Sequence, residues 1–407
     1  MSSPALSIEQ FEKVPRRVQR PALAEAHDAV LNDLCAELFA SLPRSDQRKK
    51  GRDYLWCLLG THGRKTIRNI AMLLGGQAAE QSLHHFVSGS TWDWDPVRQA
   101  LARYVARAVP PHAYVVRPLV IPKTGESTVG VEKRYFPALG QVLSAQQAVG
   151  VWAGSATLCS PINWRLHLPR SWIDDEDRRR RSAIPDEVVP ESHADCAVAA
   201  YLQITESWGL PMRPVVLEAA GPDPVGTIRR LRAARRGPFL ARAGNMVRLV
   251  VDDPALPGRG PEPLSAYQIL GLARRLRRPV LLPGHSAGAP TPALVAGVRV
   301  RLPAGPGGAG ADGGELLLLG VGEDGQRWPA EVWLTDMVDA QPAPLLRIAH
   351  LLHRVDHDFG RISDRVGIRD YTGRSFGGWH RHVTLASAAH AGAALCEVDG
   401  RRLSRTA

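Results

Sequence analysis

The first quarter of the chain carries apolar residues at the spacing of amphipathic helices. Leu31, Leu34 and Leu38 recur every three or four positions, and residues 53–76 repeat this pattern before a Gly-Gly stop. The basic stretch 45–52, which separates the two segments, is typical of a turn or a helix start. The pattern predicts a helical region from about residue 9 to residue 107.

Beyond residue 112 the apolar residues form short continuous runs. Residues 115–121 are largely apolar and stop at Pro122, as expected of a buried strand that opens into a loop. Further strand-like runs, which would form a meander, lie around 134–136, 145–158 and 161–169. The segments that follow read helix, strand, basic helix and strand, at 193–208, 213–217, 227–236 and 238–243. This order predicts a mixed α/β core.

From residue 245 to about 324 proline and glycine are dense and the apolar runs are short, which predicts a β-rich insertion. Residues 342–367 return to helical spacing, and Asp356 lies one turn beyond Leu352. The pattern divides the chain into a helical N-terminal domain (1–112), the first part of the core (113–244), the insertion (245–330) and a C-terminal helical part of the core (331–407).

The charge of the chain bears on its partners. The 407 residues include 51 Lys and Arg against 40 Asp and Glu, a net charge of +11. Such an excess favours polyanionic partners, double-stranded DNA first, although a solvated arginine face is the simpler alternative. The length indicates two or three domains.

Cysteine use and hydropathy indicate a compartment. The five cysteines are scattered and form no C-x-x-C pair, which argues against a disulfide framework or a cysteine-based zinc site. No signal peptide is evident and no apolar run reaches membrane-spanning length. We therefore expect a soluble, cytoplasmic protein without a membrane partner.

Three motifs are weak indications of chemistry. Gly284-His285-Ser286-Ala287-Gly288 matches a nucleophile elbow, but Pro290 and Pro292 make a poor helix start behind the serine. The glycine-rich stretch 305–314 opens no helix and so does not predict a phosphate loop. His380 and His382 do not share a helix face, so no metal site is predicted for them or for His390.

A distributed set of residues is more informative. Pro122 and Lys123 follow one buried strand, Glu218 ends another, and Asp356 lies on a late helix. RNase-H-like nucleases and DDE transposases hold three carboxylates at such positions, at the ends of two strands and on a helix. Those carboxylates bind two divalent ions that activate water and stabilise the leaving oxygen.

Ordered blocks along almost the whole chain carry a family resemblance. The blocks are 82–88, 92–95, 119–125, 130–135, 161–172, 215–219, 354–358 and 373–385. Together they resemble the insertion-sequence DDE transposases common in actinobacteria. The resemblance implies an RNase-H-like core with a mixed sheet, a helical N-terminal region that binds DNA, and a β-rich insertion before the acidic C-terminal helix.

The resemblance also implies that the catalytic positions are degenerate. Where the family pattern is V-I-D-D-T-G, the chain has Pro122 and Lys123 in place of both aspartates, and Glu218 and Asp356 occupy the other two acidic positions. The supporting residues of the family are replaced as well, by Asn163, Ala349, Leu352 and Ser363. An ammonium at Lys123 would repel a divalent ion and could pair with Glu218 or Asp356.

Three functions remain open on the sequence. The first is a DNA-binding or otherwise repurposed protein that has lost strand cleavage. Its phosphate contacts would come from basic residues and histidines, namely Lys49, Lys50, Arg52, Arg64, Lys65, Arg68, Arg178, Arg179, Arg229, Arg230, Arg235, Arg374, His380 and His382.

The second function is an enzyme acting on a small molecule in the old cleft, with Lys123, Glu218, and Asp356 or His357 as acid and base groups. The third is a residually active transposase that uses Mg²⁺ and substitute acids such as Glu126 or Glu132. No other cofactor is expected, and the sequence leaves the oligomeric state open.

Overall fold

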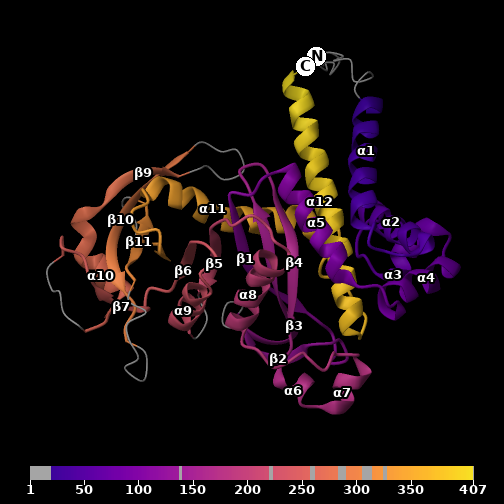
Figure 1. Ribbon diagram of the computed structural model, residues 1–407, viewed down its shortest axis with the longest axis horizontal. Coiled ribbons are helices and arrows are strands. Elements are labelled where there is room, and N and C mark those ends of the chain that lie inside the picture. The colour runs from indigo at the N-terminus through magenta and orange to yellow at the C-terminus, as the bar shows by residue number, and fades with distance from the viewer. Residues whose placement is uncertain are drawn as a thin grey trace, which may run out of the picture.

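The computed structural model describes residues 20–136, 140–219, 223–256, 262–282, 290–304, 314–323 and 328–406. The chain forms one large mixed sheet with helices packed on its faces, and a helical region at one end (Figure 1). This architecture confirms the predicted mixed α/β fold with an RNase-H-like core.

The core of the sheet is a meander followed by two parallel strands. β1 (Ala113–Pro122), β3 (Gln141–Gly154) and β4 (Cys159–His167) pair antiparallel, and β2 (Val131–Phe136) pairs with the first residues of β3. β5 (Val215–Ala219) runs parallel to β1, and β6 (Phe239–Ala243) runs parallel to β5. The parallel pairing brings the ends of β1 and β5 to the same edge of the sheet.

The predicted insertion is β-rich and continues the same sheet. Its elements are β7 (Arg248–Val251), β8 (Leu264–Ser265), α10 (Ala266–Leu272), η5 (Ala273–Leu276), β9 (Arg278–Leu282), β10 (Thr291–Arg301) and β11 (Leu316–Gly322). β12 (Glu331–Thr335), which the apolar pattern did not predict, pairs antiparallel with β6 on one side and β11 on the other. The serine motif 284–288 and most of the glycine-rich stretch lie outside the described residues.

The N-terminal region is helical, as predicted, but its second helix is interrupted. The helices are α1 (Arg20–Leu38), α2 (Ser45–Gly60), α3 (Ile67–Ala71), η1 (Met72–Leu74), α4 (Gln77–His84), η2 (His85–Gly89) and α5 (Trp94–Ala108). The chain leaves α2 at Thr61, and Gly63 has a φ of +68°, a conformation that favours glycine. A single helix over 53–76 is therefore wrong.

The remaining helices pack on the sheet or on the N-terminal region. They are α6 (Arg170–Ile173), α7 (Glu176–Arg181), α8 (His193–Leu202), η4 (Gln203–Ser207), α9 (Pro224–Ala234), α11 (Pro342–Asp358), η7 (Phe359–Ser363) and α12 (Phe376–Thr406). α7 lies in a stretch that changes from acidic to basic, and the side chain of Asp175 caps its first turn. No helix among the described residues is long and apolar enough to cross a membrane.

α12 ties the N-terminal region to the core. It runs beside α1 in Figure 1, and Gly392 lets Leu31 approach, since a Cβ there would lie 2.5 Å from Leu31 Cδ2. The fully buried Arg98 of α5 donates to Asn163 and Trp164 of β4 and to Thr384 of α12. Burial lowers the pKa of Arg98 to about 10. This guanidinium therefore joins α5, β4 and α12 inside the protein.

Candidate functional site

Three elements meet on one face of the sheet. Val116 of β1 pairs in register with Leu217 of β5, so that Arg117 lies alongside Glu218. Side chains alternate between the two faces of a strand, and Tyr114 packs against Tyr201 of α8 on the opposite face. Arg117 and Glu218 therefore point toward α11, which carries Asp356 in its last turn.

The side chain of Arg117 bridges the two acids. Its Nη1 lies 2.5 Å from Glu218 Oε2, and its Nε and Nη2 lie 2.7 Å and 2.6 Å from Asp356 Oδ1. The exposed fractions of the side chains are 27% for Arg117, 23% for Glu218 and 47% for Asp356. Charge-assisted hydrogen bonds to both acids hold the guanidinium between them.

The charges alternate along the same face beyond this cluster. Arg242 of β6 lies 3.4 Å from Glu218 on one side and 3.4 Å from Glu331 of β12 on the other. Glu331 in turn is 3.1 Å from Nε2 of His353 on α11. Burial acts to raise the pKa of Glu331, but the hydrogen bond from His353 and the charge of Arg242 outweigh it and lower that pKa.

The donor set does not fit the divalent ions that the fold family implies. Two-metal chemistry needs several carboxylates converging on ions about 4 Å apart, whereas here a cation lies between two acids and uses oxygen atoms of both. Within the described part of the chain, no group of three or more His, Cys, Asp or Glu residues could hold a metal ion. The arrangement is an ion-pair network in which Arg117 occupies the centre.

Lys123 lies elsewhere, and the prediction that it pairs with Glu218 or Asp356 is wrong. Its Nζ donates to the carbonyl oxygens of Tyr371 at 2.6 Å and Arg369 at 3.2 Å. Burial and the nearby Arg64 lower the pKa of Lys123 to about 8, although Asp370 opposes this shift. Pro122 ends β1 with an exposed ring. The end of β1 is thus bound to the segment before α12.

We expect Lys123→Met to destabilise the protein by about 1–2 kcal/mol, because two carbonyl groups lose their donor. The change should leave the ion pairs of Arg117 intact, so the variant should bind Mn²⁺ no better than the parent. Urea denaturation measures the first effect and a Mn²⁺ titration the second. The exposed Lys133 on β2 provides the control, Lys133→Met. A gain of Mn²⁺ binding in Lys123→Met, and not in Lys133→Met, would show that the ammonium of Lys123 prevents metal binding at Glu218 and Asp356.

The sequence contained a signal for Arg117 that pointed to this cluster. Residue 117 is the one charged side chain in the apolar run 115–121. Charged residues are seldom placed in buried strands without a partner of opposite charge. The substitute acids lie apart from the cluster: Glu126 follows β1 on an exposed turn, and Glu132 on β2 lies beside His167, whose pKa it acts to raise.

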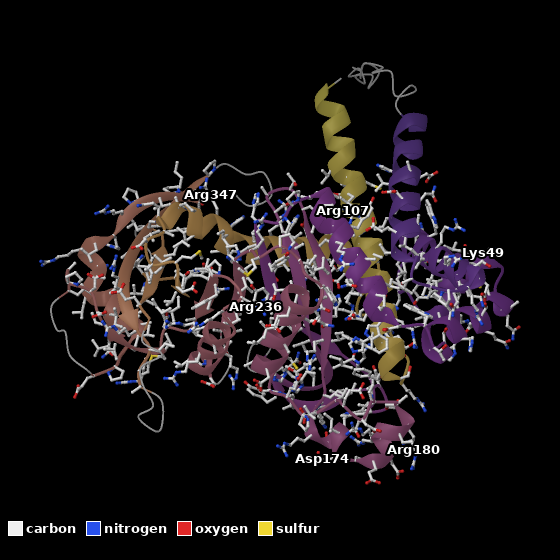
Figure 2. The ribbon with its side chains drawn as sticks, in the orientation of Figure 1. Lys49, Arg107, Asp174, Arg180, Arg236 and Arg347 are labelled. Carbon is white, nitrogen blue, oxygen red and sulfur yellow. The ribbon has the colours of Figure 1, made fainter. Side chains whose placement is uncertain are left out.

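The predicted DNA contacts fall into three groups. Exposed cations without a carboxylate partner among the described residues are Lys49, Arg52, Arg68, Arg235 and Arg374. A second group of exposed or half-buried cations forms ion pairs: Lys50 with Asp46, Arg64 with Asp370, Arg178 with Asp175, Arg179 with Asp186, and Arg230 with Asp195 and Asp223. Arg179 also donates to the carbonyl groups of Pro185 and Val188, and Arg229 donates to that of Pro303. Figure 2 shows Lys49 in the helical N-terminal region, well away from Arg180 and Arg236, which are next in sequence to the predicted contacts Arg179 and Arg235.

Lys65, His380 and His382 are buried, so the prediction that they contact phosphates is wrong for this structure. Lys65 is 3% exposed and donates to the carbonyl oxygen of Thr61. His380 stacks on Trp94 with 4.8 Å between ring centroids. The sequence could not separate buried from exposed positions here, because basic side chains and histidines on α12 face the N-terminal helices.

Two histidines of α12 share one bonding pattern. Nε2 of His382 lies 2.8 Å from the carbonyl oxygen of Gly367, and its Nδ1 lies 2.9 Å from the hydroxyl of Tyr54. His390 has the same pattern: its Nε2 lies 2.9 Å from the carbonyl oxygen of Cys159, and its Nδ1 lies 2.9 Å from the hydroxyl of Ser363. A carbonyl oxygen only accepts, so Nε2 carries the proton and Nδ1 accepts from the hydroxyl. Burial lowers the pKa of each ring to about 4.

The class of protein follows from comparison with known sequences. Residues 37–224, which include β1, β5 and their two cluster residues, match the family described as DDE superfamily endonuclease. This match confirms the resemblance to insertion-sequence transposases and places the segment in that family.

A particular relative is similar to part of the chain. The probable transposase for insertion sequence element IS701 of Microchaete diplosiphon is 26% identical over 122 residues, which are 29% of this chain and 31% of that protein. The chain therefore aligns with less than a third of the length of this relative.

Proposed function

We propose that the chain is a DNA-binding member of the DDE superfamily endonuclease family that does not cut DNA by two-metal chemistry. The observation that carries this proposal is the guanidinium of Arg117 between Glu218 and Asp356. A divalent ion would have to displace a cation that donates to both acids. It would also lie close to a positive charge, which repels it.

The charge of the chain supports DNA as the partner. Net charge is +11, and several exposed cations carry no carboxylate partner among the described residues. Phosphate contacts of this kind give affinity without sequence preference and depend strongly on salt. The family match adds a class of protein that acts on DNA.

A nicking assay tests the proposal. Supercoiled plasmid and a labelled duplex are incubated with the protein and Mg²⁺ or Mn²⁺, and binding is followed in parallel by fluorescence anisotropy. We expect salt-dependent binding and no nicked product. Robust cleavage that disappears in Glu218→Ala would overturn the loss of chemistry, and the absence of any binding would overturn the DNA partner.

A further inference from the structure

A cluster of arginines lies in the insertion, outside residues 37–224. Arg274 and Arg275 of η5, Arg277, and Arg278 at the start of β9 place four arginines in five positions. Arg274, Arg275 and Arg278 are exposed and form no ion pair with a described residue. We call these four residues the insertion arginines.

Arg277 has a different role from its neighbours. Its guanidinium lies 5.5 Å from the ring centroid of Trp328, and its Nε donates to the carbonyl oxygen of Arg274 at 2.9 Å. The first contact ties the segment to Trp328, whose Nε1 donates to the carbonyl oxygen of Leu294 in β10, and the second closes the turn after η5. The other three guanidinium groups are therefore carried by an anchored turn.

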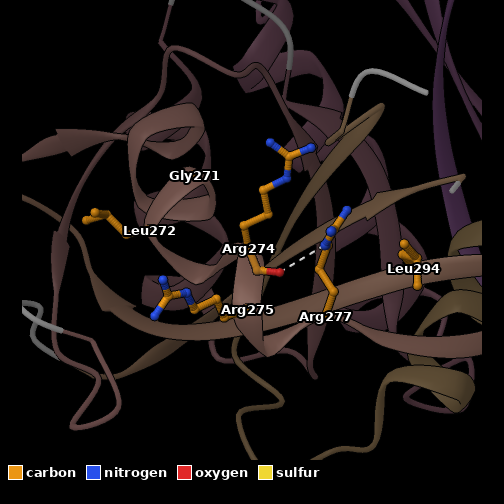
Figure 3. A pocket seen from close by; sticks show the side chains of 6 residues that line it. All are labelled: Gly271, Leu272, Arg274, Arg275, Arg277 and Leu294. Carbon is orange, nitrogen blue, oxygen red and sulfur yellow. Dashed lines mark hydrogen bonds between the residues drawn. The ribbon is translucent and has the colours of Figure 1, made fainter. Parts of the chain in front are cut away.

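The insertion arginines border two hollows. One hollow, of about 840 Å³, is lined by Gly271, Leu272, Leu294 and three of the arginines, and no acid among the described residues lines it (Figure 3). The guanidinium groups of Arg274, Arg275 and Arg277 point in different directions around it. A second hollow, of about 790 Å³, borders Arg275, Arg277 and Arg278.

The acids of the second hollow are already engaged. Asp339 lies 3.2 Å from Arg299, and Asp253 accepts from the backbone amides of Ala255 and Arg299. Both acids that line this hollow therefore already have partners, and no described carboxylate is paired with Arg274, Arg275 or Arg278. An extended polyanion satisfies such a surface better than a compact acid would.

From these observations we infer that the insertion arginines bind the phosphate backbone of duplex DNA. The inference rests on the proposed function and adds a contact surface outside the family-matched segment. A second explanation is structural: β9 pairs only with β10, and charges and prolines on edge strands prevent sheets from joining. The two explanations predict different effects of uncharged substitutions on DNA binding.

The salt dependence of binding separates them. We compare the parent with Arg274→Gln/Arg275→Gln/Arg278→Gln by fluorescence anisotropy on a 30-bp duplex across a range of KCl concentrations. Each phosphate contact contributes about 0.9 to the slope of log K against log salt, so the slope should fall by about 2.7. The matched control is Arg107→Gln/Arg180→Gln/Arg236→Gln, whose arginines are exposed and ion-paired. The control should retain the parent slope.

Two further results decide the outcome. Arg274→Lys/Arg275→Lys/Arg278→Lys keeps the charges and should keep the slope, whether or not the glutamine variant is less soluble. Size-exclusion chromatography reports association through β9. The inference is overturned if the parent binds DNA and the glutamine variant keeps its slope, or if both glutamine variants lose it equally. A parent that does not bind DNA contradicts the proposed function itself.

Discussion

Arg117→Asp is expected to give the protein a divalent metal site that the parent lacks. The substitution removes the cation between Glu218 and Asp356 and adds a carboxylate on β1 beside Glu218. Three acids on β1, β5 and α11 then converge on one place and repel one another. Without metal, the variant should lose roughly 2 kcal/mol of unfolding free energy, a value reduced for the partial exposure of these side chains.

Mn²⁺ should reverse this loss. A ligand at a hundred times its dissociation constant stabilises the folded state by about 2.7 kcal/mol. Thermal unfolding with and without Mn²⁺ should show a rise in Tm for Arg117→Asp and none for the parent.

Arg117→Asn is the control, because it removes the cation without adding a third acid. If Mn²⁺ raised the Tm of the parent as much as that of Arg117→Asp, then the guanidinium would not exclude the ion.

A second large effect is expected on acidification. His382 and His390 keep their neutral forms in the folded protein with pKa values of about 4, and burial lowers the pKa of His380 well below its ordinary value. In the unfolded chain these rings take up protons near pH 6.5. Between pH 6.5 and pH 4 the unfolded state therefore binds more protons than the folded state.

This difference in bound protons sets the sign and the size of the pH dependence of the unfolding free energy. The stabilisation is fully present above pH 6.5 and is lost as the pH falls toward 4. Each histidine contributes up to about 1.4 kcal/mol per pH unit, so three contribute up to about 4 kcal/mol per unit. Urea denaturation at pH 7, 6 and 5 measures the slope.

Replacement of His382 and His390 tests whether these histidines cause the loss of stability on acidification. Glutamine retains a donor for each carbonyl group and an acceptor for each hydroxyl but does not titrate, so His382→Gln/His390→Gln should lower the slope by up to about 2.8 kcal/mol per pH unit. The exposed His62 gives the control His62→Gln, which should leave the slope unchanged. A double variant with the parent slope would show that other groups govern acid unfolding.

Sequence periodicity predicted the architecture because most apolar residues of these segments are buried. The strand at 115–121, the strand that ends at Glu218 and the helix that carries Asp356 are all present. β12 was missed, although it is as long as β5 and β6. The break after α2 depends on Gly63, whose positive φ is not visible in a spacing of apolar residues.

The candidate site was predicted in part. Glu218 and Asp356 lie together as the resemblance implied, but the cation between them is Arg117 and not Lys123. Position along a strand decides this: Arg117 has the register of Glu218, whereas Lys123 lies beyond the end of β1. A one-dimensional pattern gives the end of a strand but not the residue that a neighbouring strand places opposite it.

The sequence also could not show which basic residues are paired with acids. A lysine or arginine in a sequence carries its charge whether it faces solvent or an acid, so Arg178 and Arg230 counted equally with Arg374. The structure separates them by their partners. It also draws attention to Arg274, Arg275 and Arg278, which lie in none of the blocks that carry the family resemblance.

The most direct test of the central claim, that Arg117 excludes a divalent ion from the two acids, is Mn²⁺ binding followed by electron paramagnetic resonance. The signal of free Mn²⁺ is titrated with the parent protein, with Arg117→Asp, and with Arg117→Asp/Glu218→Gln. We expect that only Arg117→Asp removes free Mn²⁺ from solution. Stoichiometric Mn²⁺ binding by the parent protein would contradict the claim.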